Sequence, residues 1–224
     1  SDEVTSDYRH FIGVDLGGTA IKLGRYAQNG RLLADLMIPT PQPPLPGAVT
    51  VKLCEAVELI DPYHEATFVG VGLPGPMDVM GRVARVCINL PGWTEVPLAD
   101  WLESRLKRQV ILGNDGNCAL LGEAWQGAAR GFQDVLLLTL GTGVGGGVML
   151  GGQLFTGHNG AAVEPGLICV DPEGPNCNSG NRGSLEQFAS IAGLKLLCDC
   201  DPSDLSARAA LGDPVALRIW EVYG

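Results

Sequence analysis

The stretch FIGVDLGGTAIK, residues 11–22, decides the fold of this chain, and the other elements can be placed from it. Its apolar start predicts a buried strand, and Gly17 and Gly18 predict a tight turn in which another molecule can approach the backbone. The amides of such a turn can surround an anion, and Thr19 would add a hydroxyl group and Lys22 a positive charge. Phosphate is therefore the ligand that this turn suits, although an ordinary hairpin turn is the commoner explanation of a single glycine pair.

Asp15 lies just before the turn and changes what the turn would bind. A carboxylate repels phosphate unless a divalent cation or a bound water lies between them. The combination of the glycine turn with Asp15 therefore indicates Mg²⁺ and a nucleotide.

The same pattern occurs a second time in VLLLTLGTGVGGGVML, residues 135–150. When residues 16–18 are placed over residues 140–142, the two frames coincide and Asp15 falls on Thr139. Two such hairpins facing each other across a cleft would grip a polyphosphate from both sides, whereas a Walker-type loop, absent from this sequence, does so with one. The pair is more specific than either turn, and the second turn adds Gly141, Thr142 and Gly143 to the predicted nucleotide site.

The composition indicates a globular enzyme. A chain of 224 residues with 46% hydrophobic content can bury a core and form one large or two small domains. A formal net charge of −10 leaves no basic stripe for nucleic acid or anionic membrane. No stretch reaches the about 18 continuous apolar residues of a membrane span, and the polar start lacks the apolar centre of a signal peptide. We therefore expect a cytoplasmic protein, whose seven scattered cysteines suit reduced thiols better than a disulfide framework.

The segments after the first turn predict a sheet that alternates with helices. Residues 21–26 and 31–38 read as strands joined by the hairpin signal Gln28-Asn29-Gly30, so that the chain opens with a three-stranded meander. The proline tract 39–47 reads as an extended connector more readily than as a PxxP ligand. Beyond it the pattern predicts helices over 49–60 and 97–106 and strands over 68–73, 82–88 and 110–112.

Two places in this part of the chain combine a turn or helix start with polar side chains. The turn NLPGW, residues 89–93, would suit a sugar through its amide and indole, and a plain turn with a packing tryptophan explains it equally well. Asn114 and Asp115 lie at a strand end, where a helix over 118–129 is about to begin. An aspartate at such a place is most often an N-cap, and it also presents a carboxylate to a cleft.

The last third of the chain is less regular. Residues 156–183 show no period and read as a functional loop or a stabilised insertion, which contains Glu164. One helix is predicted over 184–197, in which Glu186 either contacts a ligand or only complements the helix dipole. A short strand over 153–155 and a final helix over 215–223 complete the prediction.

With these segments in order, the chain resembles the ROK family of sugar kinases, the glucokinase-like members of the actin, hexokinase and Hsp70 superfamily. The resemblance runs from Phe11 to the end of the chain and implies an α/β fold of two ribonuclease H-like, actin-like ATPase domains around a central cleft. We expect a small N-terminal domain over 1–112 and a large C-terminal domain over 113–224 that is incomplete at its end. The motifs in this order are highly specific: DLGGTAIK (15–22), GLPGP (72–76), NLPGW (89–93), GNDGNCALLGE (113–123), LTLGTGVGGG (138–147), and the segments with Glu164 and SLE (184–186).

The resemblance also implies a reaction, in which ATP with Mg²⁺ phosphorylates a hexose hydroxyl, with glucose to glucose 6-phosphate as the first expectation. By position, Asp115 would be the general base. Phosphoryl transfer asks a protein mainly for positioning and charge neutralisation, and a carboxylate that accepts the proton of the attacking hydroxyl supplies the remainder. The implied sugar contacts are Gly75, Asn89, Asn114, Asp115, Glu164 and Glu186, and the implied nucleotide contacts are Asp15, Gly17, Gly18, Thr19, Lys22, Gly141, Thr142 and Gly143.

Two departures from the family pattern bear on these expectations. The family's zinc site uses a histidine after Glu-x-Gly and three cysteines, whereas this chain has Leu167 after Glu164-Pro165-Gly166 and only Cys177 in the run 177–184. One thiolate cannot hold a tetrahedral zinc, so we predict no structural zinc and a loop held by packing, hydrogen bonds or bound sugar. Family members also continue for several more helices, so the adenine pocket is expected to be incomplete here.

Alternatives to an ATP-dependent hexokinase stay open. A sugar-binding sensor without turnover would account for the lost zinc ligands, but a DNA-binding repressor is not expected, because only ten residues precede the first predicted strand. An enzyme that takes polyphosphate as its donor suits the glycine turns as well as one that takes ATP. A homodimer is an expectation from the family alone.

Overall fold

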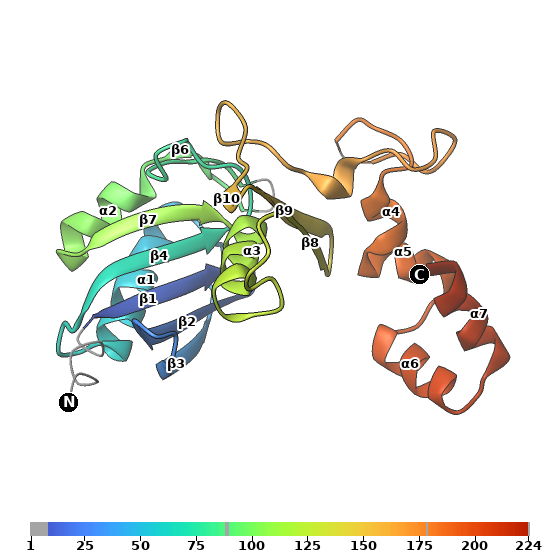
Figure 1. The fold of residues 1–224 in the computed structure, drawn as a ribbon, viewed down its shortest axis with the longest axis horizontal. Coiled ribbons are helices and arrows are strands. Elements are labelled where there is room, and N and C mark those ends of the chain that lie inside the picture. Colours follow the sequence, from blue (N-terminus) through green and yellow to red (C-terminus); the bar gives the residue numbers. More distant parts are fainter. Residues whose placement is uncertain (1–8, 88–89, 178, 224) are drawn as a thin grey trace. The chain divides into compact units, whose positions relative to one another are not determined.

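The computed structural model describes residues 9–87, 90–177 and 179–223 and divides into two compact units (Figure 1). The first unit comprises the chain up to Phe132 together with Thr156–Ala162, and the second comprises Gln133–Phe155 together with the chain from Val163 on. The predicted division after residue 112 falls inside strand β7 (Gln109–Asn114), and the division into domains stays a prediction. Among the described residues, no helix has the length and apolar character needed to cross a membrane.

The first unit is built on a five-stranded sheet with the strand order β3-β2-β1-β4-β7. Strands β1 to β3 form the predicted antiparallel meander, and β4 and β7 run parallel to β1. The predicted hairpin turn between β2 and β3 is confirmed, and it contains Gly30 with a φ of 87°, a value that favours glycine. The strands are β1 (His10–Leu16), β2 (Ala20–Ala27), β3 (Leu32–Pro39), β4 (Ala66–Leu73) and β7 (Gln109–Asn114).

Helices α1 (Pro46–Ile60) and α2 (Leu98–Leu106) pack on one face of this sheet and complete its core (Figure 1). Side chains of a strand alternate between its two faces, so Ile12 and Val14 of β1 are buried while Asp15 is exposed on the other face. The third helix, α3 (Asp115–Gln126), begins directly at the end of β7, three residues before its predicted start. The sheet therefore presents Asp15 and the start of α3 at the carboxyl ends of its parallel strands.

The proline tract is an extended connector between β3 and α1, as predicted. The predicted strand over 82–88 is shorter in the structure, where β5 (Ala84–Val86) pairs with β6 (Thr94–Val96). These two short strands lie before α2 and form a ladder of their own.

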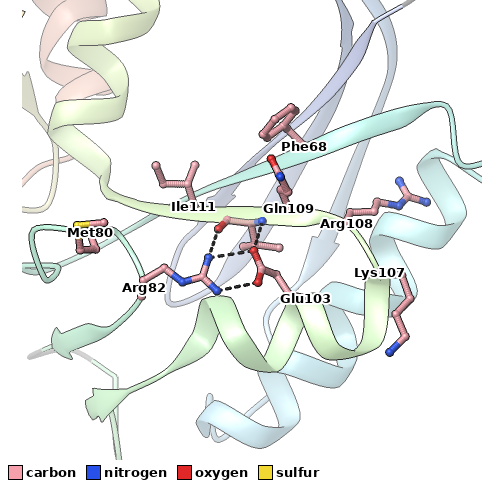
Figure 2. Close-up of a pocket in the computed structure, with 9 residues that line it drawn as sticks. Phe68, Met80, Arg82, Glu103, Lys107, Arg108, Gln109 and Ile111 are labelled. Atoms are coloured by element: carbon pink, nitrogen blue, oxygen red, sulfur yellow. Dashed lines mark hydrogen bonds and ion pairs between the residues drawn. The ribbon is translucent and has the colours of Figure 1, made fainter.

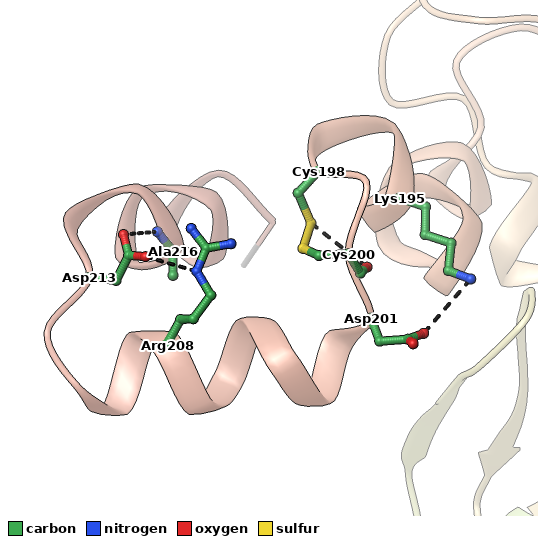
Figure 3. The surroundings of a disulfide bond; sticks show 7 residues. All are labelled: Lys195, Cys198, Cys200, Asp201, Arg208, Asp213 and Ala216. Carbon is green, nitrogen blue, oxygen red and sulfur yellow. Dashed lines mark hydrogen bonds and ion pairs between the residues drawn. A yellow bond between two sulfur atoms is a disulfide. The ribbon is translucent and has the colours of Figure 1, made fainter.

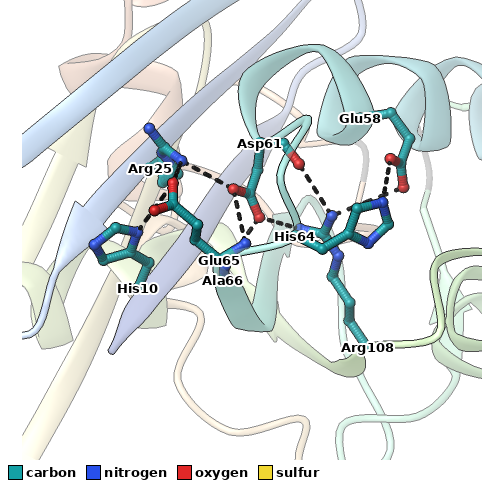
Figure 4. Close-up of polar contacts among 8 residues, drawn as sticks. All are labelled: His10, Arg25, Glu58, Asp61, His64, Glu65, Ala66 and Arg108. Atoms are coloured by element: carbon teal, nitrogen blue, oxygen red, sulfur yellow. Dashed lines mark hydrogen bonds and ion pairs between the residues drawn. The ribbon is translucent and has the colours of Figure 1, made fainter. Parts of the chain in front are cut away.

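A buried polar network lies at the amino ends of β4 and β7 (Figure 4). The carboxylate of Asp61, which follows α1, is fully buried, pairs with Arg108 and accepts a hydrogen bond from Nη1 of Arg25 at 2.9 Å. Burial alone would raise the pKa of Asp61, but the N–H groups of Ala66 and Glu65 and the two arginines outweigh burial and lower it. This network fixes the amino ends of the parallel strands, whereas Asp15 lies at their carboxyl ends.

The second unit begins with a three-stranded antiparallel sheet of β8 (Val135–Leu140), β9 (Val144–Leu150) and β10 (Gln153–Leu154). The β8–β9 pair confirms the predicted second glycine hairpin, in which Leu140 pairs with Val144 as Leu16 pairs with Ile21 in the first. A short 3₁₀ helix, η1 (Pro165–Leu167), packs on β9 within the segment that was predicted to be a loop.

The prediction of one helix over 184–197 is wrong, because the chain forms α4 (Leu185–Ala189) and α5 (Ile191–Leu197) with a break at Ser190. Ser190 has an extended backbone and its Oγ caps α5 by accepting a hydrogen bond from the N–H of Gly193 at 3.0 Å. Helix α6 (Pro202–Ala210) was not predicted, and α7 (Pro214–Tyr223) matches the predicted last helix.

These C-terminal helices share a small core made of Leu194, Leu205 and Ala216. Figure 3 shows a disulfide between Cys198 and Cys200 in the short link from α5 to α6. The expectation of reduced thiols is therefore wrong for this pair, although Cys54, Cys87, Cys118, Cys169 and Cys177 are free. A separation of two residues is too short a spacing to stand out as a disulfide in a sequence with many scattered cysteines.

Candidate active site

The first glycine turn, between β1 and β2, is closed by its own backbone and braced by the connector. The N–H of Gly17 donates to the carbonyl of Ala20 at 3.0 Å. From the connector, Oγ1 of Thr40 donates to the carbonyl of Gly17 at 2.7 Å and Nε2 of Gln42 donates to the carbonyl of Gly18 at 2.9 Å. Carbonyl groups of the turn are thus directed to the connector, which is consistent with a turn that offers amides to an anion.

Asp15 and Lys22 face each other across the β1–β2 ladder beside this turn. Nζ of Lys22 lies 3.9 Å from Oδ2 of Asp15, and both side chains are exposed. Such an exposed pair contributes little to stability, so both groups are available to a ligand.

Asn114, and not Asp115, caps helix α3. Oδ1 of Asn114 accepts a hydrogen bond from the N–H of Asn117 at 3.1 Å, and its Nδ2 donates to the carbonyl of Gly75 at 3.2 Å. The interpretation of Asp115 as an N-cap is therefore wrong. Asp115 occupies the first turn of α3, where its Oδ1 accepts from the N–H of Gly116 at 2.8 Å.

The electrostatic surroundings of Asp115 favour its protonated form. Although the residue as a whole is exposed, partial burial of the carboxyl group raises its pKa, the N–H of Gly116 works in the opposite direction, and the charge of Asp15 raises the pKa further. Burial and the charge of Asp115 also raise the pKa of Cys87 to about 12 and that of Cys118 to about 11, with Asp15 adding to the shift at Cys118. Asp15 and Asp115 thus act on the same small region at the carboxyl ends of β1 and β7.

The segment GLPGP begins in the last two residues of β4 and brings Gly75 against β5. Gly75 has a φ of 101°, and a Cβ added there would collide with the carbonyl oxygen of Val86. Asn89, the other predicted sugar contact of this region, lies outside the described residues. Trp93 is 1% exposed and its Nε1 donates to the carbonyl of Pro44 at 2.7 Å, so its indole packs in the core and offers no face to a sugar.

The second glycine turn is bound by α4 and α5. Oε2 of Glu186 accepts a hydrogen bond from the N–H of Val144 at 2.9 Å, and the N–H of Ile191 donates to the carbonyl of Gly141 at 2.8 Å. Glu186 is therefore more than a complement to a helix dipole. Glu164 lies at the start of η1. This short helix packs so closely on β9 that a Cβ at Gly166 would collide with the carbonyl of Val144.

Hydrogen bonds organise the loop around Cys177. Oγ of Ser179 donates to Sγ of Cys177 at 3.2 Å, and Nδ2 of Asn181 donates to the carbonyl of Leu167 at 2.9 Å. The Ser179 hydroxyl is the first cause of a lowered pKa at Cys177. No group of three or more potential metal ligands is found among the described residues, and the absence of structural zinc stays a prediction.

A hollow of about 610 Å³ in the first unit lies away from these residues (Figure 2). Its lining includes Phe68 at the amino end of β4, Gln109 at that of β7, and the ion pair of Arg82 with Glu103. Ligands of parallel sheets bind at the carboxyl ends of the strands, so this hollow is not the candidate site.

Each unit therefore brings together a part of the predicted site. The first contains Asp15, the turn with Gly17, Gly18 and Thr19, and Lys22, together with Gly75, Asn114 and Asp115; the second contains the turn with Gly141, Thr142 and Gly143, together with Glu164 and Glu186. The convergence of the two parts on one crevice stays a prediction. The roles of Thr40 and Gln42 were not predicted, because a side chain that donates to the carbonyl of a distant residue leaves no motif in the sequence.

Comparison with known proteins gives one consistent family. A sequence profile described as the ROK family matches residues 11–224. A glucokinase of Thermotoga maritima is 41% identical over 184 residues, which cover 82% of this chain and 58% of that protein. The chain thus spans less than two thirds of that relative's length.

Two solved structures extend this similarity to the fold. A ROK family glucokinase from Streptomyces griseus in complex with glucose and AMPPNP has a TM-score of 0.81 and 33% identity, covering 96% of this chain and 75% of that one. An inorganic polyphosphate/ATP-glucomannokinase from Arthrobacter has a TM-score of 0.68 and 31% identity, covering 84% and 71%. These matches confirm the α/β fold that the sequence led us to expect.

Proposed function

Since this chain belongs to the ROK family, we propose that it transfers the terminal phosphoryl group of ATP to a hydroxyl group of a hexose, with glucose as the first candidate. Its similarity to a glucokinase, and to a structure that contains glucose and AMPPNP, supports both the sugar and the nucleotide. The local geometry of the chain supports the roles of individual residues.

The observation that carries the proposal is the position of Asp115 in the first turn of α3, together with the raised pKa of its carboxyl group. Asn114 provides the cap of α3, so the carboxylate of Asp115 is not needed for capping. Its raised pKa makes the ionised form a better proton acceptor than an ordinary aspartate, as a general base requires. We assign to Asp115 the removal of the proton from the attacking sugar hydroxyl.

The glycine turns are assigned to the phosphates. In the first turn, amide groups and the cation of Lys22 would stabilise the charge on the transferred group. Mg²⁺ neutralises phosphate charge in such reactions, and the exposed carboxylate of Asp15 beside the turn fits a contact to it through water. In the second unit, the turn Gly141–Gly143 would bind phosphate in the same way.

The sugar is assigned to amides and carboxylates that leave polar atoms available. One Nδ2 hydrogen of Asn114 binds Gly75, which leaves the other for a hydroxyl group. Glu164 and Glu186 are the sugar contacts proposed for the second unit, and a site of such groups rejects an analogue that lacks one hydroxyl.

The test is sugar-dependent release of ADP in a coupled assay, comparing the wild type with Asp115→Asn. We expect Asp115→Asn to lower turnover by about 100-fold or more while sugar binding, measured by calorimetry, is kept. The side chain of Asp115 is exposed, so Asp115→Asn should leave the melting temperature nearly unchanged, and this measurement separates a loss of turnover from unfolding. Asp35→Asn, an exposed aspartate on β3, is the matched control and should keep its turnover. Unchanged turnover in Asp115→Asn would remove the assigned role.

A second donor is favoured by one comparison. The similarity to a polyphosphate/ATP-glucomannokinase supports polyphosphate as an alternative to ATP. Running the same assay with each donor, and with glucose, mannose and fructose, decides between them. Sugar binding without turnover for any donor would instead identify a sugar-binding sensor.

A further inference from the structure

The second glycine turn is fixed at both ends by the helix pair α4 and α5. At its start, the carbonyl of Gly141 accepts a hydrogen bond from the N–H of Ile191 at 2.8 Å. At its end, the N–H of Val144 donates to Oε2 of Glu186 at 2.9 Å. The turn is closed between these points by the N–H of Gly141, which donates to the carbonyl of Gly143 at 2.9 Å.

The side chain of Glu186 lies so close to this turn that one of its two glycines has no room for a side chain. A Cβ added at Gly143 would collide with Oε2 of Glu186, whereas a Cβ at Gly141 would meet no atom within 4 Å. Neither residue has a positive φ in the structure, so backbone conformation does not explain the difference. The carboxylate of Glu186 is therefore part of the turn's packing and not a neighbour by chance.

Among the described residues, these hydrogen bonds leave the N–H groups of Thr142 and Gly143 without a partner in the turn. They are the groups that a phosphate would use, and their direction depends on the two anchors on either side. Loss of the anchor at Val144 would let the turn change shape and would weaken anion binding.

We propose that Glu186 is a positioning residue for the phosphate-binding turn as well as a sugar contact, so that one carboxylate links the sugar to the nucleotide. This inference rests on the proposed function, which supplies both ligands. A carboxylate has two acceptor oxygens, and among the described residues Oε2 alone is engaged by a hydrogen bond, to Val144. Oε1 is then the atom that accepts a sugar hydroxyl, and sugar binding restricts the side chain that anchors the turn.

The requirement is for a hydrogen-bond acceptor and not for a negative charge, because a charge at this place would repel phosphate. Glu186→Gln keeps an acceptor for the N–H of Val144 and removes the charge, whereas Glu186→Ala removes both. The expected order of nucleotide affinity without sugar is therefore Glu186→Gln at least equal to wild type, and Glu186→Ala below both. A residue that only contacts sugar would give Glu186→Gln and Glu186→Ala the same nucleotide affinity, because both variants remove the charge.

The first experiment measures the anchor itself by amide hydrogen exchange at Val144, in the protein without ligands. We expect exchange about tenfold faster in Glu186→Ala than in the wild type, and near-wild-type exchange in Glu186→Gln. Glu123→Ala is the matched control, since Oε2 of Glu123 also accepts a backbone N–H, that of Ala128, in another part of the chain. Equal exchange at Val144 in Glu186→Ala and the wild type would overturn the inference.

The second experiment measures nucleotide affinity by calorimetry without sugar, where we expect binding about tenfold weaker in Glu186→Ala and restored in Glu186→Gln. Gly143→Ala displaces the same carboxylate from the other side, so it should weaken binding in the wild type and cost less in the Glu186→Ala background. Equal losses in Glu186→Gln and Glu186→Ala would contradict the inference. Absence of nucleotide binding by the wild type would contradict the proposed function instead, while the exchange at Val144 would still decide the role of Glu186.

Discussion

At the scale of single residues, the surroundings of Asp115 set the pH at which a general base would act. The proton is accepted by the ionised form, so kcat/KM should fall as the pH drops through the pKa of Asp115. Burial and Asp15 raise this pKa, which places the acid limb above the value of about 3.9 for an ordinary aspartate.

The charge of Asp15 is the part of this effect that a substitution can remove. Asp15→Asn should move the acid limb of the kcat/KM profile to lower pH, because it removes a negative charge that disfavours ionised Asp115. Asp15→Glu keeps the charge and is the matched control. Asp15→Asn will also lower kcat if Asp15 contacts Mg²⁺, so the position of the limb, and not the rate, is the measurement. An acid limb at the same pH in both variants would rule out the coupling.

Residue identities predicted where Asp115 lies in the fold better than they predicted the hydrogen bonds around it. The placement of Asp115 between a strand and a helix could be read from the sequence, since apolar periodicity ends there. The capping residue could not, because asparagine and aspartate are nearly equal as N-caps and stand side by side. The helix begins at Asp115, so Asn114 is its cap and Asp115 lies in its first turn.

At the scale of elements, the connector between β3 and α1 is a support for the first glycine turn. Its Thr40 is 3% exposed and donates to the carbonyl of Gly17, and the N–H of the same residue donates to the carbonyl of Thr19 at 2.9 Å. The indole of Trp93 donates to the carbonyl of Pro44 and fastens the other end of the connector. A segment that reads as a passive linker therefore fixes the shape of the turn to which we assign phosphate binding.

Removal of one hydroxyl group tests this support. Thr40→Val keeps the shape of the side chain but leaves the carbonyl of Gly17 without its partner, which should cost about 1 to 2 kcal/mol of stability and raise the KM for nucleotide. Thr50→Val is the matched control, because Oγ1 of Thr50 also donates to a backbone carbonyl, that of Pro46 at 2.7 Å, from an equally buried position. The control should leave the KM for nucleotide unchanged. The same KM shift in both variants, or in neither, would show that the connector does not position the turn.

The elements that were predicted correctly are those with local signals. The two hairpins combine apolar strands with glycine turns, and both parts of that pattern lie within a few residues of each other. At the break between α4 and α5, the local cap by Ser190 is joined by a distant contact, the hydrogen bond from Ile191 to Gly141, which the sequence pattern does not show. Helix α6 buries Leu205 as its one fully enclosed side chain, so its apolar pattern is too weak to predict a helix.

At the scale of the whole molecule, the two units differ in how much core they contain. The first has a continuous core that runs from the sheet through α1 and α2, and the C-terminal helices of the second share a cluster of three buried residues. Stability follows buried apolar area, so we expect the second unit to open at a lower free energy than the first. The sequence indicated an α/β chain large enough for two domains, but it did not indicate this difference, because burial depends on which apolar residues meet.

Two leucine substitutions test whether the units unfold separately. Leu53 in α1 and Leu205 in α6 are both helical and almost completely buried, so Leu→Ala should cost about 2 to 5 kcal/mol at either place. Amide hydrogen exchange across the chain is the measurement. Leu205→Ala should accelerate exchange in residues 185–223 and leave the strands β1, β4 and β7 protected, whereas Leu53→Ala should accelerate exchange in those strands. If Leu205→Ala accelerated exchange equally in all regions, the chain would unfold as one cooperative unit. The expectation that the second unit opens at a lower free energy than the first would then be wrong.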